Sequence, residues 1–146
     1  MADVFSKSKR SEVMSRIRST NTRPELIVRK FIHREGFRYR LHVKNLQGKP
    51  DLVLPKYKTA IFINGCFWHG HENCNLFQMP KSNKEFWSDK INKNIIRDKS
   101  NIARLAEIGW KVIVIWECQL NSVLKDTTLK NLVTDIKTAP IIDVDK

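Results

Sequence analysis

Ten consecutive residues, Gly65 to Cys74, bring several chemically versatile side chains together in one segment. The segment reads GCFWHGHENC and holds two cysteines, two histidines, two large aromatic residues and two glycines. Cys66, His71 and Cys74 carry sulfur and nitrogen donors at spacings that one tetrahedral zinc ion can collect, and Cys118 lies downstream as a fourth donor. Four protein ligands leave no position open for water, so the pattern predicts a structural zinc site.

Zinc is not the only interpretation of these residues. They can also be buried thiols beside a hydrogen-bonded histidine. The P-C-x-x-C pattern of zinc deaminases and the H-E-x-x-H helix of zinc proteases are both absent from the sequence. The chain contains three cysteines, and an odd number in a reducing compartment argues against a disulfide framework.

Asp51 and His69 form a second chemical grouping. Asp51 opens an apolar stretch, and a carboxylate at the start of a strand can hold Mg2+, which takes oxygen ligands and keeps several waters. An imidazole with a pKa near neutral can remove a proton from one of those waters, so the pair suits attack on a phosphodiester. A turn carboxylate and a surface histidine are the alternatives.

Phe67 and Trp68 stand between the first two candidate zinc ligands. Adjacent aromatic residues in a glycine-bounded loop cannot both face one core surface in regular structure. Wedging between base pairs would use both rings, at a cost of a few kcal/mol that is smallest at a mispaired step. Packing of one of the two rings in the core is the alternative.

The net charge of the chain indicates a polyanionic partner. Lysines and arginines number 27 against 15 aspartates and glutamates, which gives a net charge of +12, and they spread from Lys7 to Lys137 rather than forming a tail. A surface of this kind attracts nucleic acid through the release of counterions from phosphates. A soluble basic domain without such a partner is the alternative.

The sequence also indicates a compartment and a domain organisation. It contains no apolar run near the roughly 20 residues of a membrane span, and residues 1–10 lack the apolar core of a signal peptide. We therefore predict a cytoplasmic protein that does not associate with membranes. Residues 1–10 are predicted to be a mobile basic arm of a single domain over residues 1–146.

Two helices are predicted ahead of the first strand. Residues 11–17 have Met14 on an apolar side and arginines on the other, an arrangement that could rest on a duplex; core packing of Met14 is the alternative. The TRPE sequence that begins at Thr22 reads as a helix start with a capping box, and this helix is predicted to end at Gly36. Capping is accordingly the plain role of Glu25.

The next elements are strands. Alternating apolar and cationic residues over 37–43 predict a half-buried strand. Apolar residues after Asp51, a turn at 55–58 and a second apolar stretch at 59–63 predict a hairpin. Because the start of one strand lies opposite the end of its antiparallel neighbour, the hairpin should bring Asp51 next to the segment that begins at Gly65.

The second half of the chain alternates helix and strand. A capping box of Ser82 and Glu85 is predicted to open a long helix that ends at Gly109 and has a cationic outer face. The continuous apolar run in residues 110–116 is expected of a central buried strand. Residues 122–139 are predicted to form an amphipathic helix on the outside of the domain.

Several short motifs give the chain a family resemblance. They begin at Met14 and end at Cys118, and they read MSRI, TRPE, GKPD, GCFWH, FW, RD, GW and WEC. On these motifs the chain resembles the very short patch repair (Vsr) DNA mismatch endonucleases, which nick DNA at T·G mispairs left by deamination of 5-methylcytosine.

The resemblance implies an α/β fold of the restriction-endonuclease-like, PD-(D/E)XK type, in which helices flank a mixed central sheet beside a structural zinc site. It implies Mg2+ on Asp51 and on the backbone carbonyl of Ile63. His69 is then the general base, and Glu25 assists from the capped helix. The family carries a histidine at the position of Asn64, whose amide can still hydrogen-bond a water on the metal.

The resemblance also implies how DNA is held. Met14, Phe67 and Trp68 correspond to the wedge that enters the duplex beside the mispair. Lys90 and Asn94 fall on positions that read the mispaired bases. The family has a threonine in place of Ile63, and a main-chain ligand survives that change because the carbonyl does not depend on the side chain. The third cysteine sits one residue further along the loop, which the loop can absorb.

The leading hypothesis is therefore a Mg2+-dependent endonuclease that nicks one strand of double-stranded DNA at T·G mismatches. We expect a monomer that works beside a cytosine-5 DNA methyltransferase and mismatch-repair proteins. The alternatives are a non-catalytic, zinc-stabilised module that recognises distorted duplex, and a restriction-type nuclease of the same fold that cuts matched DNA.

Overall fold

A four-stranded mixed sheet organises residues 22–138, which are the residues that the computed structural model describes. In spatial order the strands are β1 (Arg40–Leu41), β2 (Leu52–Leu54), β3 (Thr59–Asn64) and β4 (Lys111–Trp116). β2 pairs antiparallel with both β1 and β3, whereas β3 and β4 are parallel. The arm, the helix predicted at residues 11–17 with Met14, and residue 139 lie outside the described residues.

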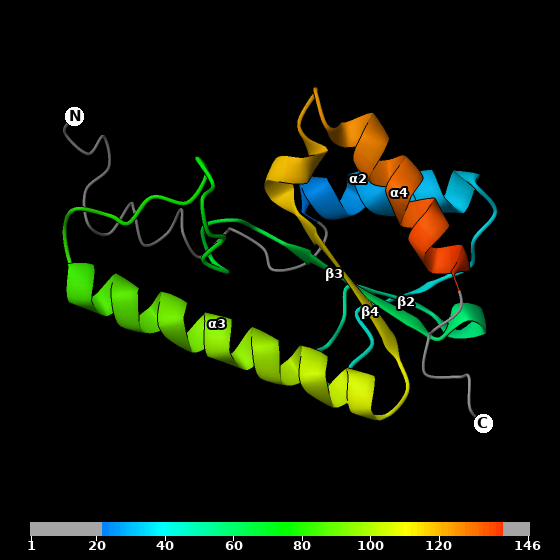
Figure 1. The fold of residues 1–146 in the computed structure, drawn as a ribbon, viewed down its shortest axis with the longest axis horizontal. Helices are drawn as coiled ribbons and strands as arrows, with labels where there is room; N and C mark the ends of the chain where they lie inside the picture. Colours follow the sequence, from blue (N-terminus) through cyan, green and yellow to red (C-terminus); the bar gives the residue numbers. More distant parts are fainter. Residues whose placement is uncertain (1–21, 139–146) are drawn as a thin grey trace.

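Three α-helices cover the sheet within residues 22–138, so the fold is a mixed α/β fold. They are α2 (Arg23–Arg34), α3 (Lys84–Glu107) and α4 (Lys125–Lys137). Figure 1 shows α2 and α4 packed together on one side of the sheet and α3 along the other. The connection between the parallel strands β3 and β4 contains α3, as parallel pairing requires a crossover.

The two faces of the sheet follow from the two-residue period of its strands. Ile61 and Ile115 belong to the main core with Val28 and Ile32 of α2 and with buried leucines of α4. Phe62 and Val114, on the other face, line a space on the side of α3 instead. One face therefore builds the core, and the other face is left to line a cleft.

α2 begins and ends where its sequence predicts, with Thr22 as its N-cap. The Thr22 hydroxyl accepts a hydrogen bond from the Glu25 N–H at 3.4 Å, and Pro24 occupies the first turn. The helix buries Val28 and Ile32 and ends before Gly36, which has a φ of 94°. At this angle a glycine costs less than any other residue, so the predicted stop is confirmed.

α3 begins differently from its prediction. The residue before the helix is Asn83, which has a φ of 55° and makes no side-chain capping hydrogen bond, so the predicted capping box of Ser82 and Glu85 is wrong. Asn83 suits this place because asparagine tolerates the left-handed region. The predicted end at Gly109 is confirmed, since this residue has a φ of 89° and follows the last turn.

The strand predicted over residues 37–43 is reduced to the two residues of β1. Phe37 is buried in the core, Leu41 is 40% exposed, and His42 turns the backbone with a φ of 49°. The left-handed conformation of His42 ends the strand, although its N–H still donates to the Asp51 carbonyl at 3.0 Å. The alternating pattern therefore gave the right type of element but too great a length.

The prediction that residues 110–116 form a central strand is also wrong. Within the described residues β4 lies at an edge of the sheet, next to β3 alone. Its apolar character has another cause, because helices lie against both faces of the sheet and each face of the strand needs apolar side chains. The predicted outer helix at 122–139 is confirmed as α4.

The hairpin that was predicted to carry Asp51 is present. β2 and β3 are joined by a short 3-10 helix, Pro55–Tyr57, and Leu52 pairs with Ile61. The Asp51 carboxylate accepts a hydrogen bond from the Ile63 N–H at 2.7 Å.

Among the helices of residues 22–138, none combines the length and the apolar character needed to cross a membrane.

Gly70 locks the Gly65–Cys74 loop onto α3. It has a φ of 59°, and a Cβ added there would lie 2.7 Å from side-chain atoms of both Ile91 and Ile95. Gly70→Ala is therefore expected to lower the free energy of unfolding by about 1–3 kcal/mol through overpacking and backbone strain. Urea denaturation measures this change.

Gly36→Ala is the matched control for that substitution. Gly36 also has a positive φ, of 94°, but a Cβ there would have nothing within 4 Å. The difference between the two variants isolates the contact with α3. Equal losses of stability in both variants would mean that this contact does not hold the loop.

Candidate active site and metal centre

A cleft of about 750 Å³ opens between α3 and the face of the sheet that the core does not use. Asp51, Asn64 and His69, which the sequence analysis singled out separately, all line it. The same cleft is also lined by three cationic side chains, those of Lys44, Lys49 and Arg97. The cleft therefore joins candidate acid–base groups to a cationic surface.

Asp51 is the most perturbed group in this cleft. Burial raises the pKa of its carboxyl from the ordinary value of 3.8 to about 6; the hydrogen bond from Ile63 opposes this rise, and the neighbouring Glu25 carboxylate adds to it. A carboxylate whose charge is poorly solvated gains more than an exposed one from a bound cation. The position of Asp51 therefore fits a metal ligand.

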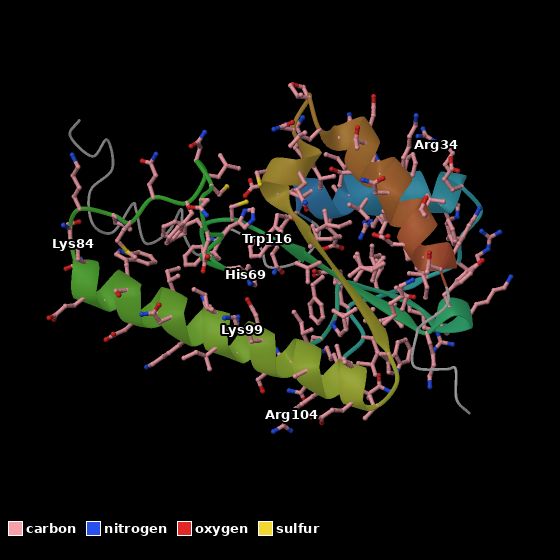
Figure 2. The ribbon with its side chains drawn as sticks, viewed as in Figure 1. Arg34, His69, Lys84, Lys99, Arg104 and Trp116 are labelled. Carbon is pink, nitrogen blue, oxygen red and sulfur yellow. The ribbon has the colours of Figure 1, made fainter. Side chains whose placement is uncertain are left out.

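His69 is held by an aspartate of α3. Its Nδ1 lies 2.6 Å from Oδ2 of Asp98, and Asp98 Oδ1 lies 3.4 Å from the Arg97 guanidinium. When Nδ1 carries the proton toward Asp98, Nε2 is left as the nitrogen that can accept one. In Figure 2, His69 lies in the space between the sheet and α3.

Sequence reasoning missed the role of Asp98. The residue was noted only as part of the RD motif, within a helix face that is otherwise cationic. An acidic side chain flanked by Arg97 and Lys99 was the available signal. Its partner, His69, is 29 residues away in the chain, so spacing alone could not pair the two.

Glu25 of α2 is a buried carboxylate next to the cleft residue His42. Its Oε2 lies 2.8 Å from His42 Nε2 and 3.1 Å from Arg29 Nη1, and its side chain is 1% exposed. Donor atoms of Glu25, His42 and Asp51 all lie within 4.8 Å of one another. The sequence analysis took His42 only for the polar face of a strand, and no pattern in the sequence linked it to Glu25.

Asn64 ends β3 and is 7% exposed. It pairs in register with Trp116 of β4, whose indole stacks on the His71 imidazole with the ring centroids 4.0 Å apart. Asn64 thus lies between the cleft and the cysteine–histidine cluster. The two chemical groupings of the sequence are neighbours in the fold.

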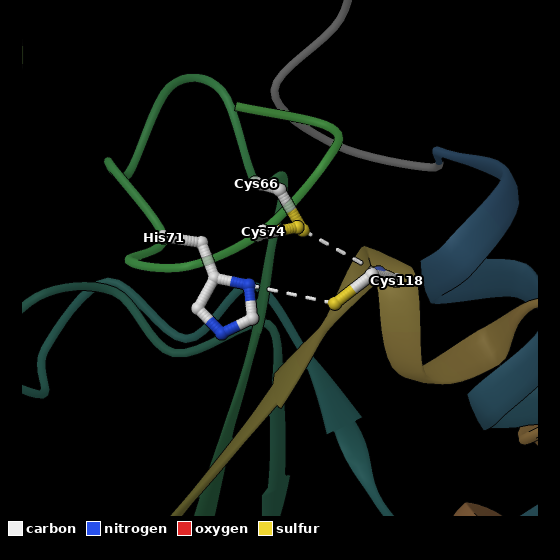
Figure 3. A group of neighbouring side chains, drawn as sticks. All are labelled: Cys66, His71, Cys74 and Cys118. Carbon is white, nitrogen blue, oxygen red and sulfur yellow. Dashed lines mark hydrogen bonds between the residues drawn. The ribbon is translucent and has the colours of Figure 1, made fainter. Parts of the chain in front are cut away.

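The cluster of Cys66, His71, Cys74 and Cys118 is assembled as predicted, with all four donor atoms within 4.8 Å of one another. Figure 3 shows the four side chains converging. Cys66 follows β3 and Cys118 follows β4. Because the two strands are parallel, their carboxyl ends meet at the same edge of the sheet, which unites residues 52 positions apart.

The chemistry of these donors fits a metal ion. Cys118 Sγ lies 3.4 Å from His71 Nδ1, and the Cys118 N–H donates to Cys66 Sγ at 3.4 Å. The Leu76 N–H donates to Cys74 Sγ at the same distance. Burial raises the pKa of the Cys66 thiol to about 12, so a nearby cation is what would make it a thiolate. Three sulfurs and one nitrogen are a donor set for a tetrahedral ion.

The aromatic pair lies between these two sites and the start of α3. The Phe67 ring centroid is 5.1 Å from that of Trp68 and 5.4 Å from that of Trp87, and the Trp68 and Trp87 centroids are 5.7 Å apart. All three rings are half-buried. Trp87 is a member of this cluster that the sequence pointed to only as part of the FW motif.

The two residues proposed to read bases lie on α3. The Asn94 amide donates to the Trp68 carbonyl at 2.7 Å, so it holds the aromatic loop against the helix. Lys90 is exposed one turn earlier. Cations along this helix are exposed as predicted, and Figure 2 shows Arg104 pointing away from the sheet.

A buried carboxylate, a histidine oriented by an aspartate and a cationic rim are the groups that a hydrolase of phosphodiesters in a polyanion requires. Comparison with known proteins leads to the same class. The family described as DNA mismatch endonuclease Vsr matches residues 2–76.

Individual relatives agree over most of the chain. The type II nicking enzyme V.NmeAIP of Neisseria meningitidis is 54% identical over 140 residues, which cover 95% of this chain and 99% of the relative. The type II nicking enzyme V.XorIIP of Xanthomonas oryzae is 46% identical over 84% of this chain and 90% of its own. The DNA mismatch endonuclease Vsr of Escherichia coli is 42% identical over 82% and 76%. The chain belongs to the Vsr family and is a DNA endonuclease.

The raised pKa of Asp51 leads to a prediction about stability. A raised carboxyl pKa means that the protonated form favours folding, so stability is fully present below pH 3.8 and falls as the pH rises through about 6. In Mg2+-free buffer at pH 7.5, Asp51→Asn should therefore raise the free energy of unfolding by about 1–3 kcal/mol. The gain should vanish near pH 4. Denaturant titrations at the two pH values measure it.

Asp89→Asn, an exposed change within α3 beyond its first turn, is the control for that experiment. It should leave stability unchanged at both pH values. A loss of stability in Asp51→Asn at pH 7.5 would contradict the account of a destabilising buried charge.

The cysteine–histidine cluster leads to a second prediction. Cys118→Ser removes one sulfur donor of the zinc site predicted from the sequence. It should reduce zinc below one ion per chain and lower the thermal midpoint, because metal binding contributes folding free energy. Metal analysis and thermal denaturation measure both effects. Treatment of the unmodified protein with excess chelator should lower the midpoint in the same way. A protein that contains no zinc as purified would refute the assignment.

Proposed function

We propose that this protein is a Mg2+-dependent endonuclease that nicks one strand of duplex DNA at T·G mispairs arising from deamination of 5-methylcytosine. The observation that carries the proposal is the common cleft of Asp51 and the His69–Asp98 pair. The protein would act as a monomer on DNA in the bacterial cytoplasm, beside a cytosine-5 methyltransferase and mismatch-repair proteins.

The names of two relatives support the substrate and the type of cut. The E. coli relative is named a DNA mismatch endonuclease, and the N. meningitidis relative is named a type II nicking enzyme. Both match this chain over more than four-fifths of its length. Mismatch recognition and cleavage of one strand are therefore the activities we assign to this chain.

Asp51 and the main-chain carbonyl of Ile63 would hold the Mg2+ ion. The Ile63 N–H faces Asp51, and the N–H and C=O of one residue in an antiparallel ladder point to the same side. The carbonyl is therefore turned toward the Asp51 edge. Held there, Mg2+ would supply Lewis-acid polarisation of a phosphate oxygen and of water.

His69 would accept the proton of the attacking water at Nε2. Asp98 orients the ring through Nδ1 and stabilises the imidazolium that forms. Asn64, at the end of β3, would hydrogen-bond a water in the cleft, and Glu25 assists from its buried position on α2. No residue in this set has to act as a covalent nucleophile.

The aromatic cluster would open the duplex beside the mispair. Phe67 and Trp68 form the wedge, with Trp87 behind them and Met14 contributing from the segment outside the described residues. A mispaired step is the least costly one to unstack, which gives selectivity without contacts to every base. Lys90 and Asn94 would contact the mispaired bases from α3.

The fold and the metal centre belong to the same proposal. We assign the sheet to the restriction-endonuclease-like, PD-(D/E)XK class, on the support of an acidic residue that opens one strand of a hairpin in a mixed sheet. We assign zinc to Cys66, His71, Cys74 and Cys118, because three thiolates and one imidazole favour it over harder ions.

One assay tests the whole proposal. Labelled duplexes, matched or carrying one T·G mismatch, are incubated with the protein and Mg2+ and resolved under denaturing and native conditions. We expect a single-strand nick in the mismatched duplex alone. Binding without cutting would mean a recognition module, and double-strand cuts in matched DNA would mean a restriction-type nuclease.

The same assay tests the catalytic residues. His69→Ala and Asp51→Ala should each slow nicking by about 10²–10⁴-fold, because proton transfer and metal binding are lost. Binding to the mismatch should stay within about threefold, since phosphate contacts remain. His33→Ala, at an exposed histidine of α2, should nick normally. Normal nicking by His69→Ala would remove the general-base assignment.

A further inference from the structure

His42 has a backbone conformation that other residues avoid and a side chain directed at the catalytic carboxylates. Its φ is 49°, in the left-handed region, and its N–H is bonded to the Asp51 carbonyl at 3.0 Å. Holding a non-glycine residue there costs on the order of 1–3 kcal/mol, and such strain is concentrated at functional sites. The strained backbone brings the imidazole Nε2 to 2.8 Å from Glu25 Oε2.

The separation of these atoms suits two ligands of one ion. Adjacent ligands of an octahedral ion with bonds of about 2.1 Å lie about 3.0 Å apart. The 2.8 Å between His42 Nε2 and Glu25 Oε2 is close to that spacing, and a donor oxygen of Asp51 lies within 4.8 Å of both. Little movement is needed for the three to share a cation.

The Glu25 end of this cluster is already prepared for such a role. The carboxylate is 1% exposed, and Arg29 Nη1 donates to the same Oε2 at 3.1 Å, which helps to fix its orientation. A buried carboxylate of this kind is stabilised by a cation, and hydrogen bonds behind a ligand are typical of metal sites. His42 itself is 27% exposed, so the site is open to ions from the cleft.

The mixture of donors determines the kind of ion. Two carboxylates alone favour Mg2+, whereas an imidazole nitrogen shifts the preference toward transition ions such as Mn2+. We propose that Glu25, His42 and Asp51 form a divalent-cation site of their own, which takes Mn2+ through His42 Nε2. This proposal rests on the proposed function in one respect only, because Asp51 is also a ligand of the Mg2+ ion proposed above.

The test is Mn2+ binding to the zinc-loaded, full-length protein without DNA. Pulsed electron paramagnetic resonance should detect a nitrogen nucleus coupled to the bound Mn2+. His42→Asn, which tolerates the left-handed backbone, should abolish that coupling and weaken Mn2+ binding about tenfold or more, with Mg2+ binding nearly unchanged. His42→Gly, which removes the backbone strain altogether, should do the same.

His33→Asn is the matched control, because His33 is an exposed histidine on α2 outside the cluster. It should keep both the coupling and the affinity. The proposal is overturned if the unmodified protein gives no nitrogen coupling, or if coupling and affinity survive in His42→Asn.

The two proposals can fail separately. T·G nicking with Mg2+ by a protein that shows no nitrogen coupling to Mn2+ would overturn only the His42 site. Nitrogen coupling in a protein that does not nick would overturn only the proposed activity.

Discussion

The parallel pairing of β3 and β4 is the contact on which the functional regions depend. It aligns the carboxyl ends of two strands. From that edge extend the loop with Cys66, the short 3-10 helix Glu117–Leu120 with Cys118, and the cleft residue Asn64. The stacking of His71 on Trp116 of β4 ties the metal centre to the same edge. A shift of one residue in this register would separate the cysteines and turn Asn64 away from the cleft.

The β2–β3 hairpin and α3 then complete the cleft from either side. The hairpin buries Asp51, which raises the pKa of its carboxyl, and the hydrogen bond from the Ile63 N–H opposes part of that rise. α3 brings Asp98 to His69 from the facing side. The residues that shift the pKa of Asp51 and the residue that orients the ring of His69 are distant in sequence, so the site exists only in the folded chain.

The sequence predicted those parts of the fold that local patterns determine. Thr22, Gly36 and Gly109 marked helix ends correctly, and the hairpin followed from two apolar stretches around a turn. The cysteines and His71 were found because metal ligands restrict residue type. The lengths and neighbours of strands were predicted less well, since helices on both faces of the sheet give the edge strand β4 an apolar run like that of a central strand. Asp98 and His42 were missed because only tertiary contacts give them partners.

α3 also sets a length. Asn94 and Asp98 lie seven and eleven residues after Trp87, a spacing that puts all three on one face of a straight helix. At about 1.5 Å per residue, the aromatic cluster and the partner of His69 are about 16 Å apart along it. The length of α3 therefore sets the separation between these two groups. If the proposed roles hold, α3 links the rings that would enter a duplex to the groups that would cut the backbone, and its length sets the distance between mispair and nick.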